Sequence, residues 1–297
     1  MKAVDFDYVR ARTLPEVCAL LHEHGSEAKL IAGGQSLVPM LAMRLARPAL
    51  VIDINDVAAL GGITLASGQI EVGGGTRQSQ MEESAEIGSR LRILHRALQW
   101  VGHPQTRNRG TLGGSLAHAD PTAELPLVAV LLDAQIVVAQ DAKADQTLAS
   151  GAFFLAPLVT SLLPEQCVTK VVFPLWPGRV GSSFHEVAPR RGDFAIVAAA
   201  AQVALDDHGR CVQAAVGLGG VAATPVRVKA VEAALLEAEQ LSPAVLKDVA
   251  ALAADQLEPD GDLQASPAYR RSVACVLIER ALRDALDEAR ATAGAGS

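Results

Sequence analysis

This chain carries two glycine pairs that decide its fold, in Ala32-Gly33-Gly34-Gln35-Ser36-Leu37 and in Thr111-Leu112-Gly113-Gly114-Ser115. In each stretch the glycines precede a hydroxyl residue and a mostly apolar segment. Glycine lets the backbone adopt positive φ and approach a ligand closely. The free N–H groups and partial positive charge of a helix N-terminus favour phosphate. Two such turns, about 80 residues apart, predict that one pyrophosphate is held from two sides, as in a bound dinucleotide.

The first stretch has the pattern of a strand, a turn and a helix. Lys29 to Ile31 is apolar enough for a short strand, and the glycine pair follows directly. Ser36 is a residue type that caps helices, so we expect it to begin a helix that extends to Arg44.

Composition favours a protein without nucleic-acid or membrane contacts. The 297 residues include 50% hydrophobic but only 3% aromatic residues, and the net charge is -7. This charge leaves no basic stripe to neutralise the phosphates of a nucleic acid. Apolar runs such as Ala195–Leu205 are too short to span a bilayer, and the acidic start Met1-Lys2-Ala3-Val4-Asp5 does not resemble a signal peptide. We therefore expect a cytoplasmic protein.

The cysteines argue against a metal centre in this chain. Cys18, Cys167, Cys211 and Cys275 are scattered, with no C-x-x-C pair. Iron–sulfur clusters and structural zinc need clustered thiolates, so we predict no metal site here. Nor does the sequence show a general acid, a nucleophile or another catalytic set.

The order of predicted elements suggests two domains with a boundary at Pro174–Pro177. The first part predicts a helix over Thr13–His24, a strand over Leu50–Ile54, a hairpin over Ile63–Val72, two helices between Gln80 and Val101, a helix from Pro121 to Leu132 and a strand over Gln135–Ala139. The second part predicts three antiparallel strands, Ser182–Val187, Ala195–Leu205 and Cys211–Val216, backed by three helical stretches of which the last is Ser266–Ala289.

Two further glycine clusters are weaker signals. Gly217-Leu218-Gly219-Gly220-Val221-Ala222 matches G-x-G-x-x-A, but Thr224-Pro225 interrupts the helix that a dinucleotide-binding fingerprint requires. We interpret it as a structural turn. Gly73-Gly74-Gly75 ends a predicted strand, and the sequence leaves open whether it serves backbone packing or approaches a cofactor.

Taken together, these motifs and several others resemble one known family. The other matching segments are Phe6-Asp7-Tyr8, Asp53-Ile54, Pro104-Gln105-Thr106-Arg107-Asn108-Arg109-Gly110, Ala119-Asp120-Pro121, Arg190-Arg191-Gly192-Asp193-Phe194-Ala195 and Pro267-Ala268-Tyr269-Arg270. In this order they are similar to the FAD-binding medium subunit of the molybdenum hydroxylases, the family of aerobic carbon monoxide dehydrogenase and xanthine dehydrogenase. The resemblance covers nearly the whole length of the chain.

The resemblance implies an α+β fold. Residues 1–176 would form a p-cresol-methylhydroxylase-type FAD-binding domain of two subdomains, residues 177–290 a flavoprotein C-terminal domain with a three-stranded antiparallel sheet and helices, and residues 291–297 a disordered tail. It also implies the residues that bind FAD: Ala32, Gly33, Gly34, Gln35, Ser36, Leu37, Thr111, Gly113, Gly114, Ser115, Ala119, Asp120, Glu124, Val168, His185, Gly192, Asp193 and Phe194.

The function implied by the resemblance is that of an electron-transfer subunit. A large subunit with a molybdopterin cofactor would oxidise the substrate, and a small subunit with [2Fe–2S] clusters would pass the electrons to FAD in this chain. The complex would be a dimer of heterotrimers. The substrate (carbon monoxide, an N-heterocycle, a purine or an aldehyde) and the acceptor (NAD, a quinone or oxygen) stay open. Two alternatives are a self-contained flavin oxidase of the vanillyl-alcohol type and a non-catalytic nucleotide-binding module.

Overall fold

The computed structural model describes residues 2–291, which divide into two compact units. Unit 1 comprises the chain up to Ser84 together with His103–Ala119 and Ala134–Phe173. Unit 2 comprises Ala85–Gly102, Asp120–Asp133 and the chain from Pro174 onward. The tail predicted to be disordered, residues 291–297, lies outside the described residues except for Ala291, which ends the last helix. In residues 2–291 no helix combines the length and apolar character needed to cross a membrane.

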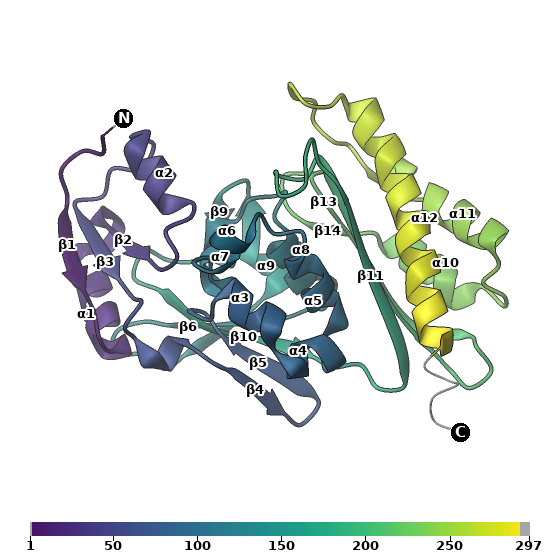
Figure 1. Cartoon of the computed structure of the whole chain (residues 1–297), viewed down its shortest axis with the longest axis horizontal. Coiled ribbons are helices and arrows are strands. Elements are labelled where there is room, and N and C mark those ends of the chain that lie inside the picture. The colour runs from purple at the N-terminus through teal and green to yellow at the C-terminus, as the bar shows by residue number, and fades with distance from the viewer. Residues whose placement is uncertain (1, 292–297) are drawn as a thin grey trace. The chain divides into compact units, whose positions relative to one another are not determined.

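Unit 1 contains three sheets (Figure 1). The first has the order β1-β3-β2, the second β4-β5-β10-β6-β7 and the third β8-β9. Their strands are β1 (Asp7–Arg10), β2 (Ala28–Ile31), β3 (Leu50–Asp53), β4 (Ile63–Ala66), β5 (Gln69–Gly73), β6 (Gln135–Ala139), β7 (Gln146–Ala149), β8 (Phe154–Ala156), β9 (Val159–Thr160) and β10 (Cys167–Pro174). Its helices are α1 (Leu14–His24), η1 (Gly25–Glu27), α2 (Leu37–Ala42), η2 (Ala58–Leu60), α3 (Gln78–Glu83), α6 (Pro104–Arg107), α7 (Leu112–His118) and α9 (Ser150–Phe153).

The three-stranded sheet of unit 1 is parallel and holds β3 in its centre. Leu50 pairs with Asp7 of β1 on one side and with Ala28 of β2 on the other. All four residues of β3 are buried, as expected for the central strand of a parallel sheet. The helix α1 begins as predicted, because the Thr13 side chain accepts a hydrogen bond from the Glu16 amide at 3.3 Å.

Unit 2 is built on one antiparallel sheet with the order β11-β12-β13-β14. The strands are β11 (Arg179–Val187), β12 (Val197–Leu205), β13 (Cys211–Gly219) and β14 (Val226–Arg227). The helices are α4 (Ala85–Arg90), α5 (Arg92–Leu98), α8 (Glu124–Leu131), α10 (Lys229–Glu237), α11 (Pro243–Ala251), η3 (Ala254–Gln256) and α12 (Pro267–Ala291). The three predicted strands are confirmed, and the short β14 adds a fourth.

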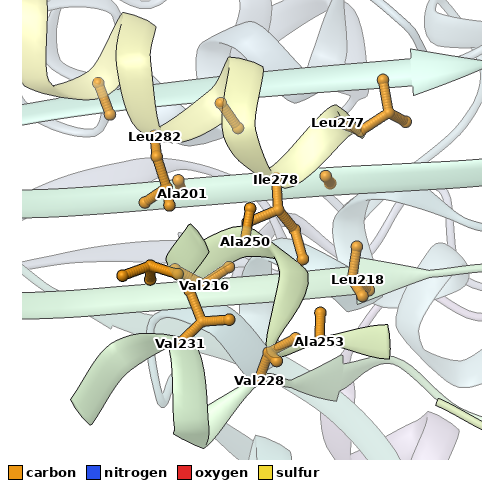
Figure 2. Close-up of a cluster of buried hydrophobic side chains, with 14 of the residues drawn as sticks. Ala201, Val216, Leu218, Val228, Val231, Ala250, Ala253, Leu277, Ile278 and Leu282 are labelled. Atoms are coloured by element: carbon orange, nitrogen blue, oxygen red, sulfur yellow. The ribbon is translucent and has the colours of Figure 1, made fainter. Parts of the chain in front are cut away.

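The core of unit 2 lies between this sheet and the helices α10, α11 and α12 (Figure 1). Figure 2 shows Ala201, Val216 and Leu218 of the sheet facing Ile278 and neighbouring helical side chains. All nine residues of β12 are buried, and five of them are alanine. Small side chains on this strand let helices pack closely, and a Cβ on Gly181 of β11 would lie 1.9 Å from the Ala285 carbonyl oxygen of α12.

Some predicted element boundaries are wrong. Three helices, not two, lie between residues 78 and 98, because extended backbone at Ser84 and a non-helical Leu91 interrupt the run. The helix α2 stops at Ala42, and Arg44 has a φ of +62°, which does not continue a helix. The predicted turn in the third glycine cluster is at Gly220, where φ is +75°, while β13 extends to Gly219.

Candidate cofactor-binding site

The first glycine turn, residues 32–37, joins β2 to α2 and keeps its backbone donors free. Gly34 has a φ of +71°, the left-handed region that favours glycine. Among the described residues, none accepts a hydrogen bond from the amides of residues 34–37. The Gln35 side chain donates to the Gly33 carbonyl at 3.1 Å. This turn therefore presents a row of N–H groups of the kind that binds phosphate oxygens.

Ser36 does not cap the helix as the sequence predicted. It occupies the position before Leu37, but its side chain makes no capping hydrogen bond. The reason is its backbone, which is helical (φ -101°, ψ -46°), whereas a capping residue needs an extended backbone to reach the amides of the first turn. Its hydroxyl group is left for another partner.

The second glycine turn forms the start of α7 and has a different chemistry. Thr111 caps the helix, and its Oγ1 accepts a hydrogen bond from the Gly114 amide at 3.1 Å. The amides of residues 112, 113 and 115 donate to backbone carbonyls. This turn thus lacks the free amides expected at a helix N-terminus. What it offers a ligand is close approach at the exposed Gly114 and the hydroxyl group of Ser115.

Unit 1 brings the two turns into direct contact. A Cβ on Gly33 would lie 2.2 Å from the Arg109 carbonyl oxygen and 2.9 Å from the Gly110 Cα. Residues 109 and 110 lead directly into the second turn, so the backbones of both turns touch at this point. No side chain fits at position 33 without moving the turns apart. The contact supports the predicted pairing of the two stretches around one ligand.

The glycine triplet at residues 73–75 serves backbone packing. The Gly74 amide donates to the Thr169 carbonyl at 2.7 Å, and its own carbonyl accepts from the Gly113 amide at 2.8 Å. A Cβ on Gly74 would lie 2.5 Å from the Val168 carbonyl oxygen. Gly74 therefore joins Val168, one of the predicted site residues, to the second turn.

The predicted carboxylate Glu124 begins α8, and Asp120 and Ala119 lie in the segment that precedes this helix. Ala119 has a left-handed backbone (φ 53°). Asp120 accepts hydrogen bonds from the Thr122 amide at 2.8 Å and from the Thr122 hydroxyl at 2.7 Å. Burial, reinforced by the charge of Asp120, raises the pKa of Glu124 to about 7. Glu124 therefore exchanges its proton near neutral pH, and its protonated form prevails below about pH 7.

His185 and its neighbour Glu186 point to opposite faces of the sheet of unit 2. The His185 Nε2 lies 2.7 Å from an Asp284 carboxyl oxygen of α12. Glu186 is 7% exposed and lines a pocket of about 400 Å³ together with Trp100 and Arg190. Neither of its carboxyl oxygens has a hydrogen-bond partner among the described residues. Burial, with the charge of Glu124 as a smaller cause, raises the pKa of Glu186 to about 8.

Glu186 was missed by sequence reasoning, although a signal for it exists. Successive side chains of a strand point to opposite faces of the sheet. Since His185 is a candidate on one face of β11, the next residue, Glu186, lies on the other face. Cross-strand pairs place Glu186 opposite Ala198, and Ala198 opposite Gly219, so the residues in register with Glu186 on β12 and β13 are small. The last predicted segment, Gly192–Phe194, forms a turn in which Gly192 has a φ of +86° and the Phe194 ring is 69% exposed.

The chain matches known flavoproteins in both sequence and structure. Residues 4–176 match the family described as "FAD binding domain in molybdopterin dehydrogenase", and residues 182–285 match "CO dehydrogenase flavoprotein C-terminal domain". The alpha subunit of the 6-hydroxypseudooxynicotine dehydrogenase complex of Paenarthrobacter nicotinovorans is 40% identical over 98% of each chain. The beta subunit of caffeine dehydrogenase of Pseudomonas sp. (strain CBB1) is 36% identical over 78% of each chain.

A solved structure agrees with these matches. A chain of the carbon monoxide dehydrogenase from Hydrogenophaga pseudoflava, in a form that lacks the Mo-pyranopterin moiety, superimposes with a TM-score of 0.92. The two chains are 30% identical, and the match covers 97% of this chain and 99% of the other. The protein is thus an FAD-binding flavoprotein. It belongs to the family of medium, FAD-binding subunits of the molybdenum hydroxylases, and it is the flavoprotein component of an oxidoreductase.

A single methyl group at the contact between the turns tests the geometry of unit 1. We expect Gly33→Ala to weaken FAD binding by about 100-fold or more, equivalent to ~3 kcal/mol, because the new Cβ forces the Arg109 carbonyl away. The measurement is the flavin-to-protein absorbance ratio after gel filtration, followed by titration of the apoprotein with FAD. Gly151→Ala is the matched control, since its Cβ meets nothing within 4 Å. Equal flavin retention by both variants would show that the contact does not govern binding.

The buried carboxyl group of Glu186 predicts a pH-dependent stability. Its pKa is about 8 in the folded chain against an ordinary value of 4.5, so the folded state binds more protons than the unfolded state between these values. The contribution of Glu186 to the free energy of unfolding is therefore most favourable below about pH 4.5 and is lost as the pH rises through about 8. Glu186→Gln removes the ionisable group, and its stability relative to the wild type should rise by about 1–3 kcal/mol from pH 5.5 to pH 8.5.

The measurement is chemical denaturation of the apoprotein at several pH values. Glu237→Gln, which alters an exposed carboxyl group on α10, serves as the control and should show no such trend. A difference between Glu186→Gln and wild type that stays constant with pH contradicts the assignment.

Proposed function

We propose that this chain takes electrons from the [2Fe–2S] clusters of a small subunit and passes them through FAD to an external acceptor. A large molybdenum-containing subunit of the same complex would oxidise the substrate. The single observation that carries the proposal is the contact of the two glycine turns at Gly33 and Arg109, because it brings together two distant segments that would hold the pyrophosphate of FAD. The relatives support it, since their names describe subunits of dehydrogenases, among them carbon monoxide and xanthine dehydrogenases.

The residues of the chain hold and orient the cofactor. FAD, when bound, supplies the ability to accept electrons singly and to release them in pairs. The free amides of the first turn would bind the pyrophosphate, and Ser115 would add a hydroxyl group from the second turn. Val168 is joined to the second turn through Gly74 and belongs to the same part of unit 1.

We extend the proposal to the predicted residues of unit 2. Glu124, His185 and the segment Gly192–Phe194 would contribute to the surroundings of the flavin ring, as the family resemblance implies. With its pKa raised to about 7, Glu124 is protonated in a large fraction of molecules at neutral pH, and a neutral carboxyl group both donates and accepts hydrogen bonds. Such a group suits a ring that carries adjacent N–H and carbonyl groups. We also propose residues 1–176 as the FAD-binding domain, residues 177–290 as the second domain, and a dimer of heterotrimers as the assembly.

The comparisons do not favour the self-contained flavin oxidase. This chain covers 98% of a relative that is itself a subunit of a dehydrogenase complex. An oxidase would need a substrate pocket and catalytic set of its own, and we assign none to this chain.

The cofactor prediction is that FAD binds without a covalent link. No cysteine or histidine lies in either glycine turn to serve as an attachment site. Acid precipitation of the purified chain should therefore release yellow FAD into the supernatant, where chromatography identifies it. Flavin that remains in the pellet, or FMN in the supernatant, would argue against this mode of binding.

The proposed roles of the three subunits are tested by co-expression of this chain with the products of its neighbouring genes, among which we expect an iron–sulfur subunit and a molybdenum subunit. We expect the three chains to elute together on gel filtration and to reduce a dye when substrate is added. The chain alone should oxidise none of the candidate substrates. Turnover by the isolated chain, or its failure to co-purify with an iron–sulfur protein, would contradict the proposal and favour the oxidase.

A further inference from the structure

We propose that Arg77 is the positioning residue that clamps the two glycine turns together and so sets the affinity for FAD. Arg77 precedes α3 in unit 1 and belongs to neither turn. The inference rests on the proposed pyrophosphate role of the turns and deepens it, because it names the side chain that fixes their spacing.

The Arg77 side chain holds the same atom that the first turn touches. Its Nη1 donates a hydrogen bond to the Arg109 carbonyl oxygen. That oxygen is also the atom against which Gly33 packs, at a distance that excludes any side chain. The carbonyl is therefore pinned between the guanidinium group and the backbone of the first turn. A change in the position of Arg77 acts directly on the joint between the two turns.

The backbone around Arg77 is tied to the second turn. Arg77 forms an isolated antiparallel β-bridge with Thr111, the residue that caps α7. Its amide donates to the Gln80 side chain at 2.9 Å, and the Gln78 amide donates to the Gly110 carbonyl at 2.9 Å. The side chain and the backbone of Arg77 thus contact the segment before the second turn and the first residue of that turn.

The other end of the guanidinium group is anchored to the parallel sheet. Its Nη2 donates to the Asn55 Oδ1 at 2.5 Å, and the Asn55 Nδ2 donates to the buried Asp53 at 2.5 Å. Asp53 ends the central strand β3 and also accepts a hydrogen bond from the Tyr8 hydroxyl of β1. Since β2 pairs with β3 and leads into the first turn, this chain of hydrogen bonds links Arg77 to the strand that positions Gly33.

The arrangement also concentrates positive charge beside the turns. Burial and the charge of Arg109 lower the pKa of Arg77, while Asp53 acts in the opposite sense. Arg77 and Arg109 thus bring two positive charges close together, and this gives a mutual repulsion. The negative charge of a bound pyrophosphate would offset this repulsion, so the contact between Arg77 and the turns should be most stable when the cofactor is bound.

The experiment compares FAD binding by the apoproteins of the wild type, Arg77→Ala, Arg77→Lys and a control. Arg10→Ala is the control, because Arg10 pairs with Asp56 on the surface of the same sheet and contacts neither turn. The dissociation constant is measured by quenching of flavin fluorescence. We expect Arg77→Ala to raise it at least about tenfold, and Arg77→Lys to raise it less, since one ammonium group replaces only part of the fork of donors. Arg10→Ala should leave it unchanged.

A second measurement separates positioning from general destabilisation. We expect hydrogen–deuterium exchange of the amides of residues 109–114 to accelerate in apo Arg77→Ala, while exchange in the core of unit 2 stays as in the wild type. Removing Asn55 by Asn55→Ala should give a smaller loss of affinity, and the double variant should lose less than the sum of the two free-energy changes.

The outcomes distinguish this inference from the proposed function. If the wild type binds FAD and Arg77→Ala binds it equally well, the clamp is refuted and the proposed function stands. Loss of affinity with unchanged exchange at residues 109–114 also refutes the clamp. Failure of the wild-type chain to bind FAD would instead overturn the proposed function on which the inference rests.

Discussion

The close approach of Gly33 to the Arg109 carbonyl is the constraint on which the cofactor site depends. The two turns come from segments that lie far apart in the sequence, and each follows its own local rules for strand, turn and helix. Their contact requires a position without a side chain, because a Cβ there would lie 2.2 Å from the carbonyl oxygen. The requirement is steric, and only glycine satisfies it without displacing backbone.

The two turns have different tasks, although their sequences look alike. Within residues 2–291 the first turn leaves the amides of residues 34–37 without protein acceptors, whereas the second uses its amides to build α7 and to bond the Gly74 and Thr76 carbonyls just after β5. The difference arises from Thr111, which caps its helix, and from Ser36, whose helical backbone prevents capping. We therefore expect anion binding to depend chiefly on the first turn and the second to contribute rigidity and close approach. A glycine pair in a sequence does not reveal which of these tasks it performs.

Local signals in the sequence predicted many elements of the fold. Thr13 caps α1, the Ser266 Oγ accepts a hydrogen bond from the Tyr269 amide at the start of α12, and β6 has its predicted bounds of Gln135–Ala139. Each of these features depends on a few residues that are adjacent in the sequence, so it can be predicted without knowledge of the tertiary structure. The misplaced boundaries, such as the break at Leu91, depend on tertiary packing, which overrides local propensity. The two glycine turns themselves predicted that one dinucleotide is held from two sides, and the family resemblance added the expectation that this dinucleotide is FAD.

Long-range contacts explain why part of the site could not be predicted from sequence. Arg77 is an ordinary polar residue before a short helix, and its importance arises only when β3 and the second turn come to lie beside it. Glu186 similarly becomes unusual only through burial, which arises when the elements of unit 2 pack together. A buried carboxyl group without a partner costs stability unless it stays protonated. Unit 2 nevertheless retains the carboxyl group of Glu186 at the wall of a pocket. The strand β12 beside it consists mainly of small apolar residues. A buried ionisable group that lowers the stability of the fold is typical of functional sites, where the group interacts with a ligand.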